Sequence, residues 1–167
     1  MRKLLFLCLL AAVFSCNDNE PEQDIVTRDT TIFMQDSILP SGIEDRVRFK
    51  NLIWLPVFDS AKGDVTVKQQ RPVSADTLTA DKLIKEINGS WDGIELVFRK
   101  ISHDTIYVAI PESSFLTQQM GSSGAFSYMS STTYTLTELK DIKFVNYDFE
   151  EGDHLAPGTL KRTDFEN

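Results

Sequence analysis

Alternating apolar and polar residues predict two β-hairpins along the chain. In the first hairpin, residues 46–58 begin with alternation and become continuously apolar, and residues 65–73 alternate again after a polar turn that contains Gly63. In the second, the β-rich segments 94–101 and 105–110 flank a short polar turn. The continuously apolar run 52–55 indicates a central strand that is buried on both faces.

A helical pattern follows each hairpin. After the first, Thr79 is a candidate N-cap, an apolar stripe follows at helical spacing, and Gly89 is a stop signal. After the second, Ser122 or Ser123 is expected to cap a helix that carries Ala125 and other apolar residues at helical spacing. Its Ser and Thr residues have mediocre helix propensity, so packing must hold it, and we expect one side to be buried.

A last strand, residues 142–149, completes the order ββ-α-ββ-α-β. This order predicts a single α+β domain, with a mixed β-sheet of about five strands and two packed helices. The remaining residues, 150–167, are turn-rich, and Phe165 is their large apolar anchor. Trp54 is expected in the core, and Trp91 is expected to be a partly exposed loop residue.

The N-terminus has the pattern of a secretory signal. Arg2 and Lys3 precede the apolar run 4–14, which is too short for a bilayer core that needs roughly 20 residues. The run ends in Val-Phe-Ser-Cys, which resembles a bacterial lipobox and implies cleavage before Cys16 and lipidation of its thiol. The alternative is an ordinary signal peptide with an incidental cysteine. The other cysteine of the chain, Cys8, lies inside the predicted signal.

Three segments follow from this pattern: a signal peptide at 1–15, a flexible tether at 16–45 and the domain at 46–167. The tether is polar, although residues 31–34 and 38–40 are apolar enough to pack as an edge strand. The acidic stretch after Cys16 resembles the export tag of outward-facing lipoproteins. We therefore expect a lipid-anchored envelope protein, in the outer membrane and exposed at its surface.

The net charge of the chain limits which partners are expected. The net charge is −8, and removal of the signal takes away the positive Arg2 and Lys3 and no acidic residue, which leaves about −10. An acidic surface repels phosphate backbones, so no nucleic-acid partner is expected. Attachment to the membrane would depend on the N-terminal lipid alone.

The order of elements and the final third of the chain resemble the GerMN domain, the sporulation and spore germination type. The telling segments are Tyr-Thr-Leu-Thr-Glu at 134–138 and Ile-Lys-Phe-Val at 142–145, with support from the strand 52–57, Gly63 and the Leu-Ile pair at 83–84. The resemblance covers residues 47–151. It implies a non-catalytic binding or assembly module in secreted or membrane-anchored bacterial proteins, with no catalytic residues to carry over.

Candidate chemistry is sparse. The acidic group Glu150, Glu151, Asp153 and His154 has carboxylates for a hard cation and a zinc ligand, but its spacing matches no calcium loop or zinc helix, so a solvated acidic turn is expected and no metal is assigned. His103 is expected in a surface turn. A Gly-Ser-Ser-Gly segment at 121–124 lacks the lysine of a phosphate loop and is interpreted as a helix entry.

These observations favour a non-enzymatic protein without a cofactor that binds an envelope protein, another copy of itself or a cell-wall component. The alternative is a lipoprotein that binds a carbohydrate or another small ligand, with Trp91 as the candidate stacking surface.

Overall fold

The computed structural model of the chain describes residues 48–61 and 63–166. The predicted signal peptide, the tether and the lipidation residue Cys16 lie outside these ranges. All described residues belong to a single unit of the chain, the second of two, which spans residues 36–167. Within the described part, no helix is both long and apolar enough to cross a membrane.

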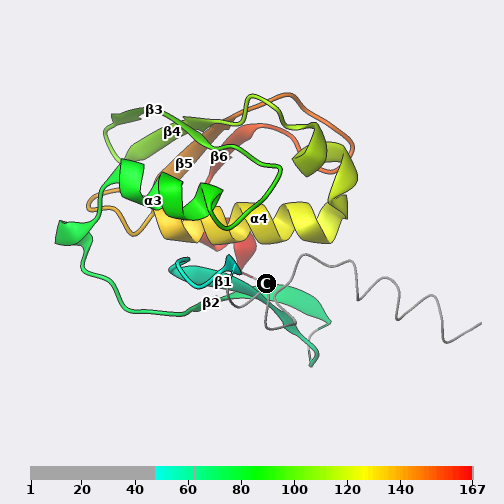
Figure 1. Cartoon of the computed structure of the whole chain (residues 1–167), viewed down its shortest axis with the longest axis horizontal. Coiled ribbons are helices and arrows are strands. Elements are labelled where there is room, and N and C mark those ends of the chain that lie inside the picture. The colour runs from blue at the N-terminus through cyan, green and yellow to red at the C-terminus, as the bar shows by residue number, and fades with distance from the viewer. Residues whose placement is uncertain (1–47, 62, 167) are drawn as a thin grey trace, which may run out of the picture. The chain divides into compact units, whose positions relative to one another are not determined.

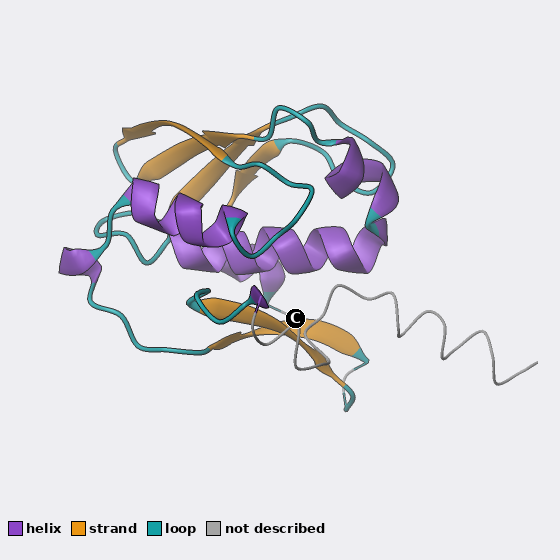
Figure 2. Ribbon diagram, in the orientation of Figure 1, coloured by secondary structure: helices purple, strands orange, loops and turns teal. Residues whose placement is uncertain are grey.

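The second unit is an α+β domain whose elements follow the predicted order (Figures 1 and 2). The strands are β1 (Trp54–Asp59), β2 (Asp64–Gln69), β3 (Val97–Ser102), β4 (Thr105–Ala109), β5 (Phe144–Asp148) and β6 (Gly158–Leu160). The helices are α3 (Ala80–Asn88) and α4 (Gly121–Leu136), with short helical turns η2 (Ala75–Thr77), η3 (Phe115–Gln119) and η4 (Arg162–Phe165). Thr79 caps α3 as predicted, because its hydroxyl accepts a hydrogen bond from the Lys82 amide at 3.3 Å.

The strands form two sheets, so the predicted single sheet is wrong. β1 and β2 pair antiparallel as a hairpin, and the other sheet has the order β3-β4-β5-β6. In that sheet β4 and β5 are parallel and the other pairs antiparallel. The hairpin cannot join it because α4 lies between them and contacts β1 and β2 on one side and β5 on the other (Figure 1). The predicted turn-rich tail supplies the edge strand β6.

β1 and β3 begin later than predicted, at Trp54 and Val97 instead of residues 46 and 94. Before each of them, hydrogen bonds from a side-chain amide take the place of strand pairing. Residues 49–53 precede β1 as a turn whose apolar members, Phe49, Leu52 and Ile53, are buried. The Gln70 side-chain amide donates to the carbonyls of Phe49 at 2.9 Å and Leu52 at 3.2 Å. Before β3, the Asn88 side chain both donates to the Leu96 carbonyl at 3.0 Å and accepts from its amide at 2.9 Å. Buried backbone groups are therefore satisfied without a ladder, which lets these apolar residues enter the core.

Helix α4 is buried on all sides, whereas the sequence predicted burial on one. Every residue from Gly124 to Leu136 except Phe126 is buried, because the two sheets cover opposite faces of the helix (Figure 2). Several hydroxyl groups are hydrogen-bonded within this layer, for instance Ser131 to the Trp54 carbonyl at 2.6 Å. The predicted serine cap is also wrong, since Met120 occupies the N-cap position of α4, directly after η3, and makes no side-chain capping hydrogen bond.

Two threonines of α4, Thr133 and Thr135, test this polar packing. The Thr133 and Tyr147 hydroxyls form a buried hydrogen bond of 2.9 Å, whereas the buried Thr135 hydroxyl has no hydrogen-bond partner among the described residues. We expect Thr133→Val to lower the free energy of unfolding by about 2 kcal/mol, because it leaves the Tyr147 hydroxyl unpaired. Thr135→Val should raise it by about 1 kcal/mol, because it removes an unpaired polar atom.

Urea unfolding of both variants measures the difference. The substitution is the same in both, and Thr and Val have similar helix propensities, so each variant is the control for the other. Effects of the same sign and size at the two positions would contradict the assigned hydrogen bonding.

Candidate functional site: a cationic pocket at the end of helix α4

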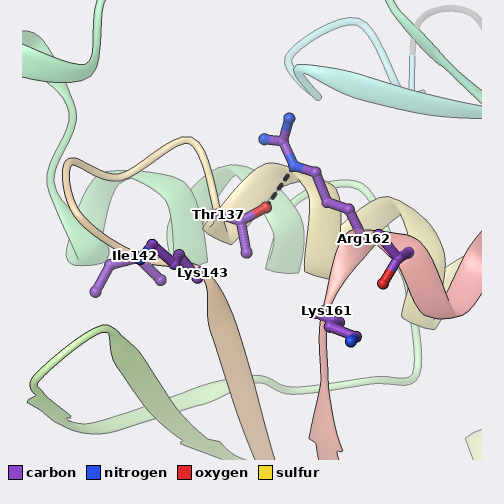
Figure 3. A pocket seen from close by; sticks show the side chains of 6 residues that line it. Thr137, Ile142, Lys143, Lys161 and Arg162 are labelled. Atoms are coloured by element: carbon purple, nitrogen blue, oxygen red, sulfur yellow. Dashed lines mark hydrogen bonds between the residues drawn. The ribbon is translucent and has the colours of Figure 1, made fainter.

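A pocket of about 260 Å³ lies where the C-terminal end of α4 meets the ends of two strands (Figure 3). β5 and β6 are antiparallel neighbours with Val145 opposite Leu160, so the start of β5 and the end of β6 lie at the same end of the sheet. This arrangement brings residues far apart in the chain into one lining. We call it the cationic pocket, and its lining residues are Thr137, Ile142, Lys143, Lys161, Arg162 and Thr163.

Arg162 is held in place by several contacts. Its Nε donates to the Thr137 hydroxyl at 2.7 Å, and its Nη2 donates to the Tyr134 carbonyl at 3.0 Å and to Glu138 Oε1 at 2.6 Å. The guanidinium also lies 5.1 Å from the ring centres of both Trp54 and Tyr134. Trp54 in turn donates to Glu138 at 2.9 Å. Arg162 therefore ties η4 to α4 and β1 and is a fixed part of the pocket wall.

Lys143 and Lys161 are exposed, and none of the ion pairs between described residues includes either of them. The carboxylate of Asp164, which is close in sequence, accepts a hydrogen bond from the Lys161 backbone amide at 2.9 Å. Buried Ile142 adds an apolar surface to the lining. The pocket thus presents two available ammonium groups, which suit an anion, beside a guanidinium that is already paired with Glu138.

The sequence did not reveal this site. Lys143 and Lys161 come together only through the pairing of β5 with β6, and β6 was interpreted as part of an irregular tail. The segment 142–145 was singled out for its resemblance to a family pattern and not for its charge. The available signal was the Lys-Arg pair at 161–162, which stands out in an acidic chain.

Trp91 does not lie where the sequence predicted it. Its side chain is 1% exposed and packs edge-on against Phe49, with ring centres 4.9 Å apart, and against Tyr128 at 5.4 Å. Trp54, which was expected in the core, is only partly buried. Trp91 therefore presents no ring face to a carbohydrate, and the stacking surface proposed for it is absent from this structure.

The acidic turn after β5 packs against η3 and the start of α4. The His154 amide donates to the Thr117 carbonyl at 3.0 Å, and the imidazole Nδ1 lies 3.3 Å from the hydroxyl of exposed Ser122. The structure thus joins the Gly-Ser segment and the acidic turn, which the sequence treated separately. Among the described residues, no three or more His, Asp, Glu or Cys side chains are placed to hold a metal ion. The predicted turn at His103 is present between β3 and β4.

Glu150 and Glu151 themselves border a smaller hollow of about 120 Å³. The Ser113 hydroxyl donates to the Glu150 carbonyl at 2.9 Å and so connects the acidic turn to the segment after β4. Glu112 adds a third carboxylate to the lining. This hollow is acidic, in contrast to the cationic pocket.

No protein-family model matches the chain, and no curated protein matches it. Among solved structures, the tandem GerMN domains of the sporulation protein GerM from Bacillus subtilis are similar, with a TM-score of 0.42 and 16% sequence identity. The match covers 66% of this chain and 43% of that one, so it spans less than half the length of the solved chain. The proposals below rest on the residues of this chain.

Proposed function

We propose that this protein is a lipid-anchored component of the bacterial cell envelope, whose GerMN-like domain is a non-catalytic binding or assembly module. The observation that carries the proposal is Cys16, placed after a positive start and the apolar run 4–14. Acyl chains on Cys16 would hold the protein at a membrane, and the polar segment up to residue 45 would separate the domain from it. The acidic residues after Cys16 favour an outer-membrane location that faces outward.

The contacts in the domain support a binding role. Arg162 is fixed by its bonds to α4, and the pairing of Ser122 with His154 fastens the acidic turn to the helix. These polar groups stabilise the arrangement of elements. Lys143 and Lys161 remain available to a ligand, and we therefore assign the domain to binding.

Metabolic labelling tests the anchor. We expect incorporation of labelled palmitate to be lost in Cys16→Ser and the protein to leave the membrane fraction, because the lipid-bearing thiol is gone. Cys8→Ser is the matched control, since it removes the other cysteine of the chain and should keep the label. Labelling that persists in Cys16→Ser, or that is lost equally in both variants, would contradict the proposal.

A further inference from the structure

We propose that the cationic pocket binds an oxyanion group, a carboxylate or a phosphate, at the end of a larger ligand. This inference deepens the proposed function, because it depends on the domain being a binding module and names the chemistry that it recognises. It is carried by the exposed Lys143 and Lys161, which line the pocket together with Arg162 where β5 begins and β6 ends (Figure 3).

The pocket is lined by positively charged side chains, whereas the whole protein is negatively charged. The chain carries a net charge of −8, so a cationic patch on it is a local concentration of opposite sign. Among the described lysines, Lys140 forms an ion pair with Asp76 at 3.4 Å. Lys143 and Lys161 have no such partner among the described residues, so an incoming anion does not have to displace one.

The C-terminal end of a helix normally repels anions, because its last carbonyl groups carry partial negative charge. Here Arg162 removes that obstacle, since its guanidinium donates to the Tyr134 carbonyl near the end of α4 and also pairs with Glu138. The positive charge of Arg162 is therefore already compensated by the carboxylate of Glu138. The binding energy for the anion must therefore come from the two lysines.

The remaining lining fits a small polar end group. Thr137 is already engaged, because its hydroxyl accepts from Arg162 and donates to the Thr133 carbonyl at 2.8 Å. The exposed Thr163 side chain is left as a hydroxyl donor next to the lysines. The volume of about 260 Å³ lies just below the roughly 300 Å³ at which pockets for whole drug-sized ligands begin. An end group of a larger molecule is therefore the expected occupant.

Nuclear magnetic resonance titration of the mature chain in a non-ionic detergent tests the inference. Inorganic phosphate and acetate are the two probes, each added at constant ionic strength against chloride. We expect saturable shifts confined to the amides of residues 137, 143 and 161–163, with a dissociation constant on the order of 1 mM. Tighter binding of one probe would identify phosphate or carboxylate as the preferred group.

The double variant Lys143→Gln with Lys161→Gln should bind the preferred probe at least tenfold more weakly. A matched double variant on α3, Lys82→Gln with Lys85→Gln, removes two exposed lysines elsewhere and should bind unchanged. Equal loss in both variants, no loss in the first, or shifts spread over the surface would overturn the inference. Such results would leave the palmitate test of Cys16 unaffected, so the two proposals fail separately.

Discussion

Gly152→Ala is expected to lower the free energy of unfolding by about 3 kcal/mol, because the turn after β5 has no space for a methyl group. A Cβ atom at this position would lie 2.6 Å from both Cβ and Oγ1 of Thr117 and 3.0 Å from its carbonyl oxygen. Thr117 cannot easily move away from the added methyl group. It is 1% exposed, its hydroxyl donates to the Ser113 carbonyl at 3.0 Å, and its own carbonyl accepts from the His154 amide.

Thermal or urea unfolding of Gly152→Ala measures this cost. Glu151→Ala is the control, because Glu151 is the exposed neighbour in the same turn and its truncation should change stability by no more than about 0.5 kcal/mol. A Gly152→Ala protein as stable as the control would show that the turn moves away from η3 without penalty, contrary to the packing described above.

Stability is expected to fall steeply above pH 10, because two tyrosines are buried in the neutral form. Burial raises the pKa of Tyr128 well above its ordinary value of 10.0, with a smaller contribution from nearby Tyr147. Burial likewise raises the pKa of Tyr147, although the hydrogen bond from Thr133 opposes the shift. Above pH 10 the unfolded chain releases both phenolic protons while the folded chain keeps them.

The stabilisation by these groups is therefore complete below pH 10 and is lost as the pH rises toward the folded pKa values. Each tyrosine contributes a slope of about 1.4 kcal/mol per pH unit in that window. Urea unfolding between pH 8 and pH 11.5 would measure the slope, and Tyr128→Phe should reduce it by the contribution of one group. Because the two proteins differ only at residue 128, the difference between the two curves isolates the contribution of Tyr128. An identical slope in Tyr128→Phe would contradict the assignment.

Local signals predicted much of the fold. Both hairpins and the cap of α3 at Thr79 could be predicted, because turn residues, alternation and capping act over a few positions. The order ββ-α-ββ-α-β follows from the same signals. The division into two sheets could not be predicted, because it depends on which side of α4 each hairpin packs.

The two tryptophans illustrate the same limit. Trp54 lies in a strongly apolar segment but turns partly outward to meet Glu138, which is 84 residues away in the chain. Trp91 lies in a polar loop, yet it fills the space between Phe49 and Tyr128. Apolar surroundings in sequence therefore did not indicate burial. The cationic pocket escaped prediction for the same reason, since its lysines meet only through a short strand, β6, that carries little pattern of its own.

The burial of α4 between the two sheets also constrains how the chain folds. Ser131 bonds to the backbone of Trp54, 77 residues earlier in the chain, and Thr137, at the C-terminal end of α4, accepts a hydrogen bond from Arg162, 25 residues later. Helix α4 therefore becomes buried only after segments from both ends of the domain have packed against it. Its Ser- and Thr-rich sequence has little intrinsic tendency to form a helix alone. Folding is consequently expected to be a late, concerted event that requires η4, so a ribosome-bound chain lacking η4 would still have a partly uncovered α4.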